Sequence, residues 1–351
     1  MKRRFPAGVL AVLLLCGCLF TSCAQEPQKY SAHSFDYFDT ATTVTGYAHS
    51  KAEFDAVAEQ VLEQLEEYHR LYTIYHRFEG LENLCTVNEL VDGAHRTVTV
   101  DQKIIDLLVY AREMYTLTDG MVNVAMGSVL KLWHDYRTIG MDDPVKAALP
   151  PADTLAEAAG HTDITKMVID RQARTVTLTD PAMRLDVGAI AKGYAVEQIA
   201  RSLEQQGITG YVLNVGGNVR TIGGKPEGSG WTVGLENPDD TAAEPLAYLE
   251  LAGQALVTSG SYQRYYLVDG KRYHHIIHPE TRMPAEGYLS VSVLCADSGL
   301  GDALSTALFC MPLTEGLALV ESLPDVEVLW VATDGTQTLS SGWERYVKNE
   351  E

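Results

Sequence analysis

Two long stretches early in the chain carry apolar residues at the spacing of a helix face. From Ala52 to Leu71, apolar side chains recur at Phe54, Val61 and Leu65, and acidic residues occupy the opposite face. The stretch 101–118 shows the same spacing and is followed by an Asp-Gly pair. Because residues three or four apart lie on one face of an α-helix, both stretches predict helices packed against a core.

The remaining pattern alternates short apolar runs with Gly, Pro, Asn and Asp, which is typical of strands joined by turns. Strands are predicted at 35–47, 168–169, 175–178, 211–215, 231–235, 246–251, 255–258, 265–268, 289–294 and 326–332. Further helices are predicted at 123–133, 191–206, 302–309 and 314–322, with a surface excursion over 142–160. This order indicates the α+β class, with mostly antiparallel strands and packed helices in a single large domain.

The N-terminus has the composition of an export signal. Three basic residues, Lys2, Arg3 and Arg4, precede an apolar run over 7–20, which is too short to cross a membrane comfortably. The small residues around Cys23 resemble a bacterial lipoprotein cleavage site, so Cys23 is expected to be lipidated. Cys18 is a competing site, and an ordinary cleaved signal or an uncleaved anchor is the other alternative.

These features divide the chain into a signal peptide over 1–23, a polar tether over 24–33 and a folded domain over 34–351. We expect the folded domain to be exported. A lipid anchor would hold it at the outer face of the cell membrane, or at its periplasmic side.

The net charge of the chain limits the kinds of molecule that it can bind. The formal net charge is −20, from 47 acidic and 27 basic residues, which argues against general nucleic-acid binding. A phosphate site in such a chain must be built locally from backbone N–H groups, a few cations or a metal. Outside the signal the cysteines are three and widely spaced, at Cys85, Cys295 and Cys310, which fits neither a disulfide framework nor a zinc site.

Candidate chemistry is concentrated in five glycine-containing segments. Each combines flexible backbone with groups able to hold a phosphate or a metal. Together they indicate convergence on one polyanionic ligand. The segments are Asp186–Tyr194, Asn214–Asn218, Thr258–Arg264, His274–Pro284 and Gly301–Ala307.

Two of these segments suggest a cation and a phosphate site. Asp302 and Thr306 are four apart and share a helix face, where their oxygens suit a hard cation. The alternative is that Asp302 only caps its helix. Lys192 enters a helix behind a glycine turn, which suits a phosphate, although a tight turn with a solvated lysine fits equally well.

The other three segments are less specific. The simpler interpretation of Asn214–Asn218 is a hairpin turn, and that of Thr258–Arg264 is a loop that ends a strand. His274, His275 and His278 form the densest titratable cluster and include a candidate general base, although at least one of them is expected to be a structural hydrogen-bonding group. Zinc is disfavoured because no fourth ligand stands at a useful spacing.

Taken together, the five segments closely resemble the ApbE family of FAD:protein FMN transferases. That family shows Asp-Leu-Gly-Gly-Ile-Ala-Lys-Gly-like, Asn-x-Gly-Gly-Asp/Asn and Thr-Ser-Gly-Asp/Ser-Tyr segments. His-His-Ile-x-Asp-Pro-x-Thr-Gly-x-Pro and Asp-Ala-Leu-Ala/Ser-Thr-Ala follow. All five occur here in the same order, within a resemblance that runs from about Phe35 to the C-terminus.

The resemblance implies an enzyme, a transferase that cleaves the FAD pyrophosphate and moves FMN to a Thr (or Ser) hydroxyl of another protein. AMP would leave and Mg²⁺ would be required. The acceptor is expected to be an exported protein of an electron-transfer system. The alternatives are an FAD pyrophosphatase that gives FMN and AMP, and a non-catalytic FAD-binding lipoprotein.

The resemblance also implies roles for particular residues. Asp302, Thr306 and the Ala189 carbonyl would hold Mg²⁺, and His275 would be the catalytic base. Contacts to FAD are implied for Tyr75, Asn123, Val124, Ala125, Asp186, Lys192 and Ile276.

Three positions depart from the family pattern. His278 stands where Asp is usual, Met283 is assigned to the position where Gly is usual, and Asn123 stands where Asp is frequent. The proposed metal pair and Lys192 are intact, so activity is still expected.

Overall fold

The computed structural model describes residues 26–89, 96–239 and 241–348 of the 351-residue chain. The signal peptide and Cys23 lie outside these residues. The α-helices of the described chain are α2 (Lys51–Tyr72), α3 (Leu84–Asn88), α4 (Gln102–Leu117), α5 (Gly127–Asp142), α6 (Ala152–Ala159), α7 (Ala191–Gln205), α8 (Ser298–Cys310) and α9 (Leu313–Ser322). Short 3₁₀ turns are η1 (Pro144–Lys146), η2 (Ile164–Lys166) and η3 (Trp343–Tyr346).

An eight-stranded antiparallel sheet forms the centre of the domain, in the order β1-β2-β6-β7-β10-β13-β14-β15. Its strands are β1 (Gln28–Ser34), β2 (Thr42–Ala48), β6 (Tyr211–Val215), β7 (Asn218–Ile222), β10 (Ala255–Gly260), β13 (Tyr288–Cys295), β14 (Glu327–Ala332) and β15 (Gln337–Leu339). Three smaller sheets flank it: β3 (Arg96–Thr99) with β5 (Thr175–Leu178) and β4 (Met167–Asp170), β8 (Trp231–Leu235) with β9 (Ala247–Leu251), and β11 (Tyr265–Val268) with β12 (Lys271–His274).

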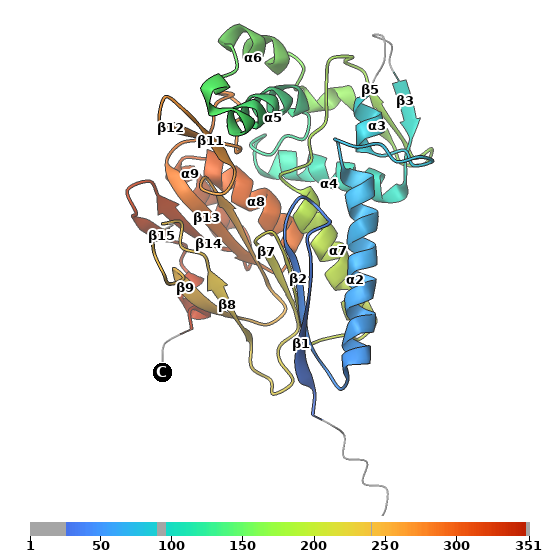
Figure 1. Cartoon of the computed structure of the whole chain (residues 1–351), viewed down its shortest axis with the longest axis vertical. Helices are drawn as coiled ribbons and strands as arrows, with labels where there is room; N and C mark the ends of the chain where they lie inside the picture. Colours follow the sequence, from blue (N-terminus) through green and yellow to red (C-terminus); the bar gives the residue numbers. More distant parts are fainter. Residues whose placement is uncertain (1–25, 90–95, 240, 349–351) are drawn as a thin grey trace, which may run out of the picture.

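Helices cover one face of the central sheet, where α7 packs on β7, α8 packs on β10 and β13, and α2 packs on β2 (Figure 1). The main hydrophobic core lies between these layers and includes Phe54, Leu65, Ile199, Val293 and Phe309. The β8–β9 hairpin covers the other face over a second core around Trp343. The predicted α+β class and single domain are therefore confirmed.

A third small core joins α5 and α6 to the β11–β12 hairpin at one end of the molecule (Figure 1). Trp133 of α5 is its centre and donates from its indole nitrogen to the Arg282 carbonyl at 2.8 Å. This end of the domain, together with the starts of α7 and α8, positions the candidate site.

Most predicted elements are confirmed within a few residues, but three segments differ. The helix predicted at 123–133 is α5, which begins at Gly127 and continues to Asp142. Residues 28–34, most of the predicted tether, form strand β1 and pair along their whole length with β2. Residues 35–41, predicted as strand, form the loop between β1 and β2, where Phe38 and Asp39 have positive φ values of 55° and 51°. Alternation of residue types alone does not reveal where such a turn interrupts two strands.

None of the helices in the described part of the chain combines the length and the hydropathy needed to cross a membrane.

Candidate functional site

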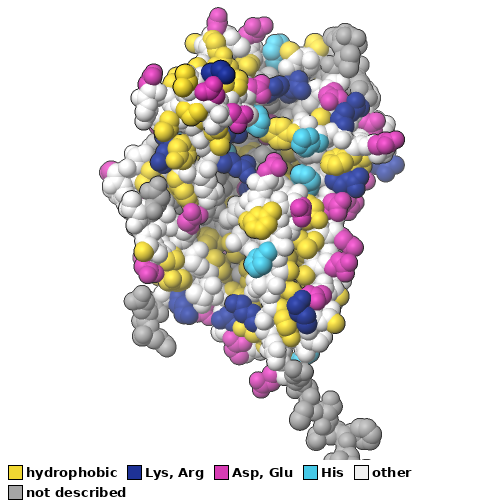
Figure 2. Space-filling view, in the orientation of Figure 1, with side chains coloured by type: hydrophobic (Ala, Val, Ile, Leu, Met, Phe, Trp, Pro, Cys, Tyr) yellow, Lys and Arg dark blue, Asp and Glu magenta, His cyan; other side chains and the backbone are white. Residues whose placement is uncertain are grey.

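A hollow of about 410 Å³ lies where the β1–β2 loop, α2, α5 and the start of α7 meet. In the space-filling view, His side chains and Lys or Arg side chains border a depression in the upper half of this face (Figure 2). Three predicted site residues, Tyr75, Asp186 and Lys192, line this pocket. The pocket is also lined by Phe38, Asp39, His69, His134, Arg137, Met141, Gln263 and Arg264.

Asp186 is held by the segment that leads into α7. Its backbone N–H donates to the Val124 carbonyl at 2.8 Å, and its Oδ1 accepts from the N–H of Gly188 at 2.9 Å. Burial raises the pKa of the Asp186 carboxyl, and the Gly188 hydrogen bond opposes that effect. The glycine turn therefore fixes a carboxylate in the wall of the pocket.

Tyr75 forms an aromatic wall of the pocket with His134 of α5. The ring centroids are 5.0 Å apart, and the Tyr75 hydroxyl lies 3.5 Å from His134 Nδ1. Burial raises the pKa of Tyr75 to about 12, so its hydroxyl keeps its proton at neutral pH. A flat ligand ring can pack against such a surface.

Lys192 and Asp302 meet where α7 and α8 approach each other closely. Lys192 Nζ lies 3.8 Å from Asp302 Oδ1, and the N–H of Gly193 donates to Asp302 Oδ2 at 2.8 Å. Only glycine fits between the helices, because a Cβ on Gly193 would lie 2.4 Å from the Cβ of Asp302. Asp302 is 5% exposed, and burial raises the pKa of its carboxyl.

The alternative role of Asp302 as a helix cap is wrong. Helix α8 begins at Ser298, and Asp297 is the cap, since its side chain accepts from the N–H of Leu300. Asp302 stands in the second turn, so no capping requirement explains a buried carboxylate there.

The oxygens near Asp302 suit a hard cation. Thr306 Oγ1 lies 3.5 Å from Ser259 Oγ at the end of β10. The N–H of Gly193, four residues after Ala189, donates to Asp302, which leaves the Ala189 carbonyl without a hydrogen-bond donor in the described chain. No cluster of three His, Cys, Asp or Glu side chains forms a metal site among the described residues. A cation here would therefore have one carboxylate and otherwise neutral oxygen donors.

His274, His275 and His278 differ in the hydrogen bonds that their ring nitrogens form. His274 is structural, because its Nδ1 accepts from the N–H of Ile276 and its Nε2 therefore donates to the Ala285 carbonyl. His278 Nδ1 accepts from the N–H of Glu280. His275 Nδ1 is buried and has no hydrogen-bond partner in the described structure. Of the three, His275 is thus the histidine with a buried ring nitrogen that has no hydrogen-bond partner among the described residues.

The charge state of His275 follows from its surroundings. Burial, followed by the charges of Arg264 and Arg137, lowers its pKa to about 3. The imidazole is therefore neutral at physiological pH, which is the form that accepts a proton.

Four other predicted contact residues do not line the pocket. Val124, Ala125 and Ile276 are at most 5% exposed and belong to the main core. The side chain of Asn123 donates to the Thr162 carbonyl at 2.9 Å and accepts from the N–H of Ala125. These residues support the strand-like segment beside Asp186, and a contact to FAD stays a prediction for each.

The Asn214–Asn218 segment is the β6–β7 hairpin turn, as its simpler interpretation proposed. Gly216 and Gly217 have φ values of 57° and 83°, which suit a tight hairpin. A Cβ on Gly216 would lie 2.3 Å from Thr40 Oγ1, so this turn supports the β1–β2 loop at the edge of the pocket.

The loop after β12 corrects one sequence assignment. Arg282, and not Met283, has the left-handed backbone conformation that favours glycine, with φ 61°. Arg282 therefore stands at the position of the family's glycine. Met283 packs into the small core with Trp133.

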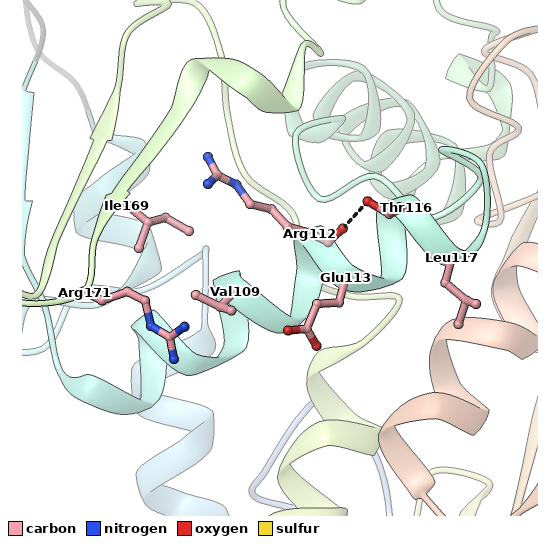
Figure 3. Close-up of a pocket in the computed structure, with 7 residues that line it drawn as sticks. All are labelled: Val109, Arg112, Glu113, Thr116, Leu117, Ile169 and Arg171. Carbon is pink, nitrogen blue, oxygen red and sulfur yellow. Dashed lines mark hydrogen bonds between the residues drawn. The ribbon is translucent and has the colours of Figure 1, made fainter.

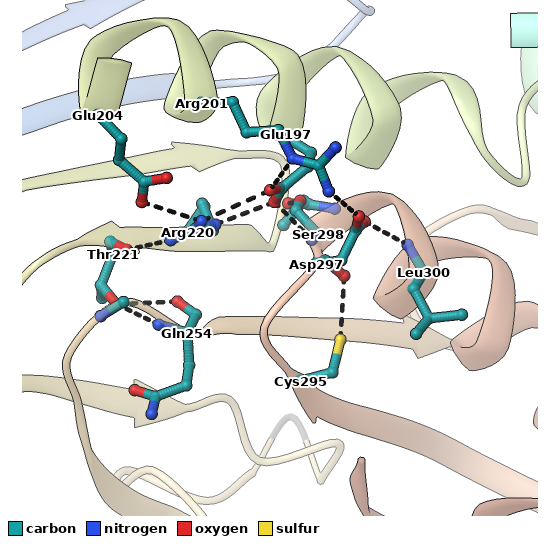
Figure 4. Close-up of polar contacts among 12 residues, drawn as sticks. Glu197, Arg201, Glu204, Arg220, Thr221, Gln254, Cys295, Asp297, Ser298 and Leu300 are labelled. Carbon is teal, nitrogen blue, oxygen red and sulfur yellow. Dashed lines mark hydrogen bonds and ion pairs between the residues drawn. The ribbon is translucent and has the colours of Figure 1, made fainter. Parts of the chain in front are cut away.

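Behind the pocket, a buried ionic network ties α7 to β7 and to the start of α8 (Figure 4). Glu197 accepts from Arg220 Nε at 3.0 Å and from the N–H of Ser298 at 2.9 Å. Arg201 links Glu197 to Asp297. This network fixes the relative position of the two helices that bear Lys192 and Asp302.

A second hollow, of about 680 Å³, lies between α4 and β4 (Figure 3). It contains none of the predicted site residues. Its lining consists of Val109, Arg112, Glu113, Thr116, Leu117, Ile169 and Arg171. It is a broad surface depression, and the candidate chemistry lies in the pocket that contains Tyr75, Asp186 and Lys192.

Comparisons with known proteins show the family of this chain. The profile of the ApbE family matches residues 38–330. The FAD:protein FMN transferase of Klebsiella pneumoniae (strain 342) is 33% identical over 288 residues, which cover 82% of this chain and 85% of that protein. The FAD:protein FMN transferase of Treponema pallidum (strain Nichols) is 33% identical over 259 residues, which cover 70% of each chain.

Solved structures show the same fold. The crystal structure of the ApbE protein of Thermotoga maritima superposes with a TM-score of 0.79 at 27% identity, and covers 92% of this chain and 100% of that one. The flavin transferase ApbE of Vibrio cholerae gives a TM-score of 0.74 at 24% identity, with 91% and 99% covered.

Proposed function

The chain belongs to the ApbE family, whose members compared above are FAD:protein FMN transferases, and from this premise we propose its particular reaction. It transfers FMN from FAD to a Thr (or Ser) hydroxyl of an exported acceptor protein and releases AMP. The reaction depends on Mg²⁺.

One observation carries the proposal. Lys192 lines the pocket that also contains Tyr75 and Asp186, and its ammonium lies 3.8 Å from the buried carboxylate of Asp302. The same lysine thus connects a pocket with an aromatic wall to a buried group suited to a cation. A flavin dinucleotide needs both features, because its rings are flat and its diphosphate is anionic.

Asp302, Thr306 and the Ala189 carbonyl are the residues that would hold Mg²⁺. Bound there, Mg²⁺ would act as a Lewis acid on the phosphate oxygens. The unused acceptor capacity of the Ala189 carbonyl and the burial of Asp302 support this assignment. In phosphoryl transfer, positioning and charge neutralisation contribute more than covalent help from the enzyme.

His275 supplies the base. The hydroxyl oxygen of the acceptor forms a bond to the phosphorus on the FMN side, and the bond from that phosphorus to the bridging oxygen breaks. AMP leaves with the bridging oxygen, and the hydroxyl proton passes to the neutral imidazole of His275. The unpartnered Nδ1 of His275 supports this role.

The export signal and the lipoprotein-like Cys23 support an extracytoplasmic location. We infer that a lipid anchor at Cys23 holds the enzyme at the membrane surface. The acceptor is then an exported protein, which fits an electron-transfer system that needs covalent flavin.

Mass spectrometry tests the reaction. The chain from Ala24 onward is incubated with FAD, Mg²⁺ and an exported Thr-containing acceptor domain. We expect the acceptor to gain the mass of one FMN, with AMP released in equal amount and both signals lost when Mg²⁺ is chelated.

The acceptor with its Thr replaced by Val is the control and should gain no mass. If AMP and free FMN were the products, the reaction would be hydrolysis of FAD and not transfer to the acceptor. FAD binding without either product would make the chain an FAD-binding protein.

A further inference from the structure

Two arginines in the pocket have no acidic partner. Arg137 of α5 and Arg264 of the loop between β10 and β11 both line it. Neither forms an ion pair with a carboxylate within 4.0 Å in the described part of the chain. Arg137 is half-buried and Arg264 is exposed, and both stay without a carboxylate partner although the chain has 47 acidic residues.

Their hydrogen bonds use few of their donors. Arg137 Nη2 lies 3.3 Å from His134 Nδ1, and Arg264 Nη2 donates to the Asp39 carbonyl at 3.2 Å. A guanidinium carries five N–H donors, so most of the donors on both residues remain unused among the described residues.

The two charges act on each other. Burial, and then the charge of Arg264 among other groups, lowers the pKa of Arg137. Arg264, Arg137 and Lys192 all line the same pocket, and the positive charge of each lowers the pKa of His275. Repulsion between these positive charges raises the free energy of the empty pocket. An anionic ligand bound between them would offset that repulsion.

We propose that Arg137 and Arg264 are substrate-positioning residues that bind, together with Lys192, the diphosphate of the flavin dinucleotide. The planar guanidinium fork matches phosphate oxygens in a bidentate geometry. The inference rests on the proposed function. It adds Arg137, which lies in none of the five sequence segments, and gives a role to Arg264, the last residue of the segment Thr258–Arg264.

The surroundings of each arginine give it a separate positioning task. His134, whose ring packs at a tilt against Tyr75, also contacts Arg137, so the aromatic wall lies directly beside this cation. Arg264 reaches across the pocket to the β1–β2 loop through the Asp39 carbonyl. A diphosphate bound to Arg264 is therefore connected to the loop that forms the edge of the pocket.

Equilibrium binding tests the proposal without turnover. FAD and riboflavin are titrated separately into the chain from Ala24 onward, with Mg²⁺ and without an acceptor. Arg137→Gln and Arg264→Gln are each expected to weaken FAD binding by about tenfold or more, as expected for loss of hydrogen bonds to a charged group. Riboflavin, which has no phosphate, should lose much less affinity than FAD in either variant.

Arg171→Gln, which alters an arginine lining the other hollow, is the matched control and should bind FAD like the wild type. Arg137→Lys and Arg264→Lys keep the charge and are expected to give intermediate affinities. They also keep the proposal testable if a glutamine variant fails to fold.

Unchanged FAD affinity in the glutamine variants, or an equal loss of riboflavin affinity, would overturn the inference. Wild-type FAD binding without transfer to an acceptor would overturn the proposed function alone. No FAD binding by the wild type would overturn both.

Discussion

Asp302 is a carboxylate whose position is unfavourable for the fold alone. It is 5% exposed, and burial raises its pKa, so the charged form is disfavoured in the folded protein. If the charged carboxylate of Asp302 stabilised the fold, its pKa in the folded protein would be lowered and not raised. The buried position of Asp302 is therefore consistent with a carboxylate that binds a cation.

Asp302→Asn is expected to lower Mg²⁺-dependent FAD turnover by at least about a hundredfold, since metal assistance contributes several kcal/mol. Without Mg²⁺, its free energy of unfolding at pH 7 should equal or exceed that of the wild type, because the variant buries no charge. Turnover assays and urea denaturation measure the two effects. Full Mg²⁺-dependent activity in Asp302→Asn would disprove the metal assignment.

His275 gives a second prediction at this scale. His275→Ala should lower kcat by about 10²- to 10⁴-fold, the usual contribution of a general base, with a much smaller effect on FAD affinity. The kcat/KM for FAD in the wild type should show no acid limb from this residue between pH 8 and pH 5, because its pKa of about 3 keeps it neutral there.

His33→Ala, which alters an exposed histidine on β1, should leave both kinetic constants unchanged. If His275→Ala weakened FAD binding as much as it lowered kcat, the residue would be a binding group and not the base.

At the scale of elements, the contact between α7 and α8 decides the geometry of the site. Gly193 allows the helices to approach until its N–H reaches Asp302. Lys192 precedes Gly193 and faces the pocket. A shift of one helix would therefore move both charged groups relative to each other.

Gly193→Ala tests this contact. The added methyl group would lie 2.4 Å from both the Cβ of Asp302 and the Ser298 carbonyl, so the helices must separate. We expect a loss of about 1–3 kcal/mol in the free energy of unfolding and a loss of FAD turnover.

Ala195→Gly is the matched control, because it weakens the same helix by about 1 kcal/mol without adding atoms near Asp302. It should retain turnover. Equal activity in both variants would show that the close approach does not determine the site.

The network of Glu197 and Arg220 joins α7 to β7 and has a pH dependence of its own. Burial alone would raise the pKa of Glu197, but hydrogen bonds and the charge of Arg220 lower it overall from 4.5. A depressed carboxyl pKa stabilises the fold above the unfolded pKa. This contribution is lost as pH falls below about 4.5.

Arg220→Met should cost up to about 3–5 kcal/mol, because it removes the buried arginine partner of Glu197 and leaves only the half-exposed Arg201 as its cation. The double variant Glu197→Gln, Arg220→Met should recover part of that loss. Chemical denaturation at pH 7 and at pH 4 measures these differences. Additive losses in the double variant would show that the two residues are not coupled.

At the scale of the whole molecule, the pocket is assembled from segments that are distant in sequence. Phe38, Tyr75, Arg137, Asp186 and Arg264 come from five separate parts of the chain. A ligand in the pocket therefore links the helical layer to the end formed by α5 and the β11–β12 hairpin.

FAD at about 100 times its Kd should stabilise the folded domain by about 2.7 kcal/mol, seen as a higher Tm in a thermal-shift assay. AMP alone should stabilise it less, because it leaves the aromatic wall formed by Tyr75 and His134 uncovered. No shift at saturating FAD would contradict the pocket assignment.

The sequence by itself determined the local features of this protein. Helical spacing predicted α2 (Lys51–Tyr72) and α4 (Gln102–Leu117), and five ordered segments indicated the family and selected Asp186, Lys192 and Asp302. Such features depend on neighbours within a few residues, and periodicity records them directly.

Only the tertiary structure decided which of these groups meet. It places the loop 35–41 at the edge of the pocket and brings Arg137 and Arg264 into the same pocket as Lys192. It also shows that His274 is used in structural hydrogen bonds, whereas Nδ1 of His275 has no partner among the described residues. The reason is physical: these contacts depend on the order of strands in the sheet and on close helix packing, which join residues far apart in the chain. No spacing in the sequence records the distance between residues joined in this way.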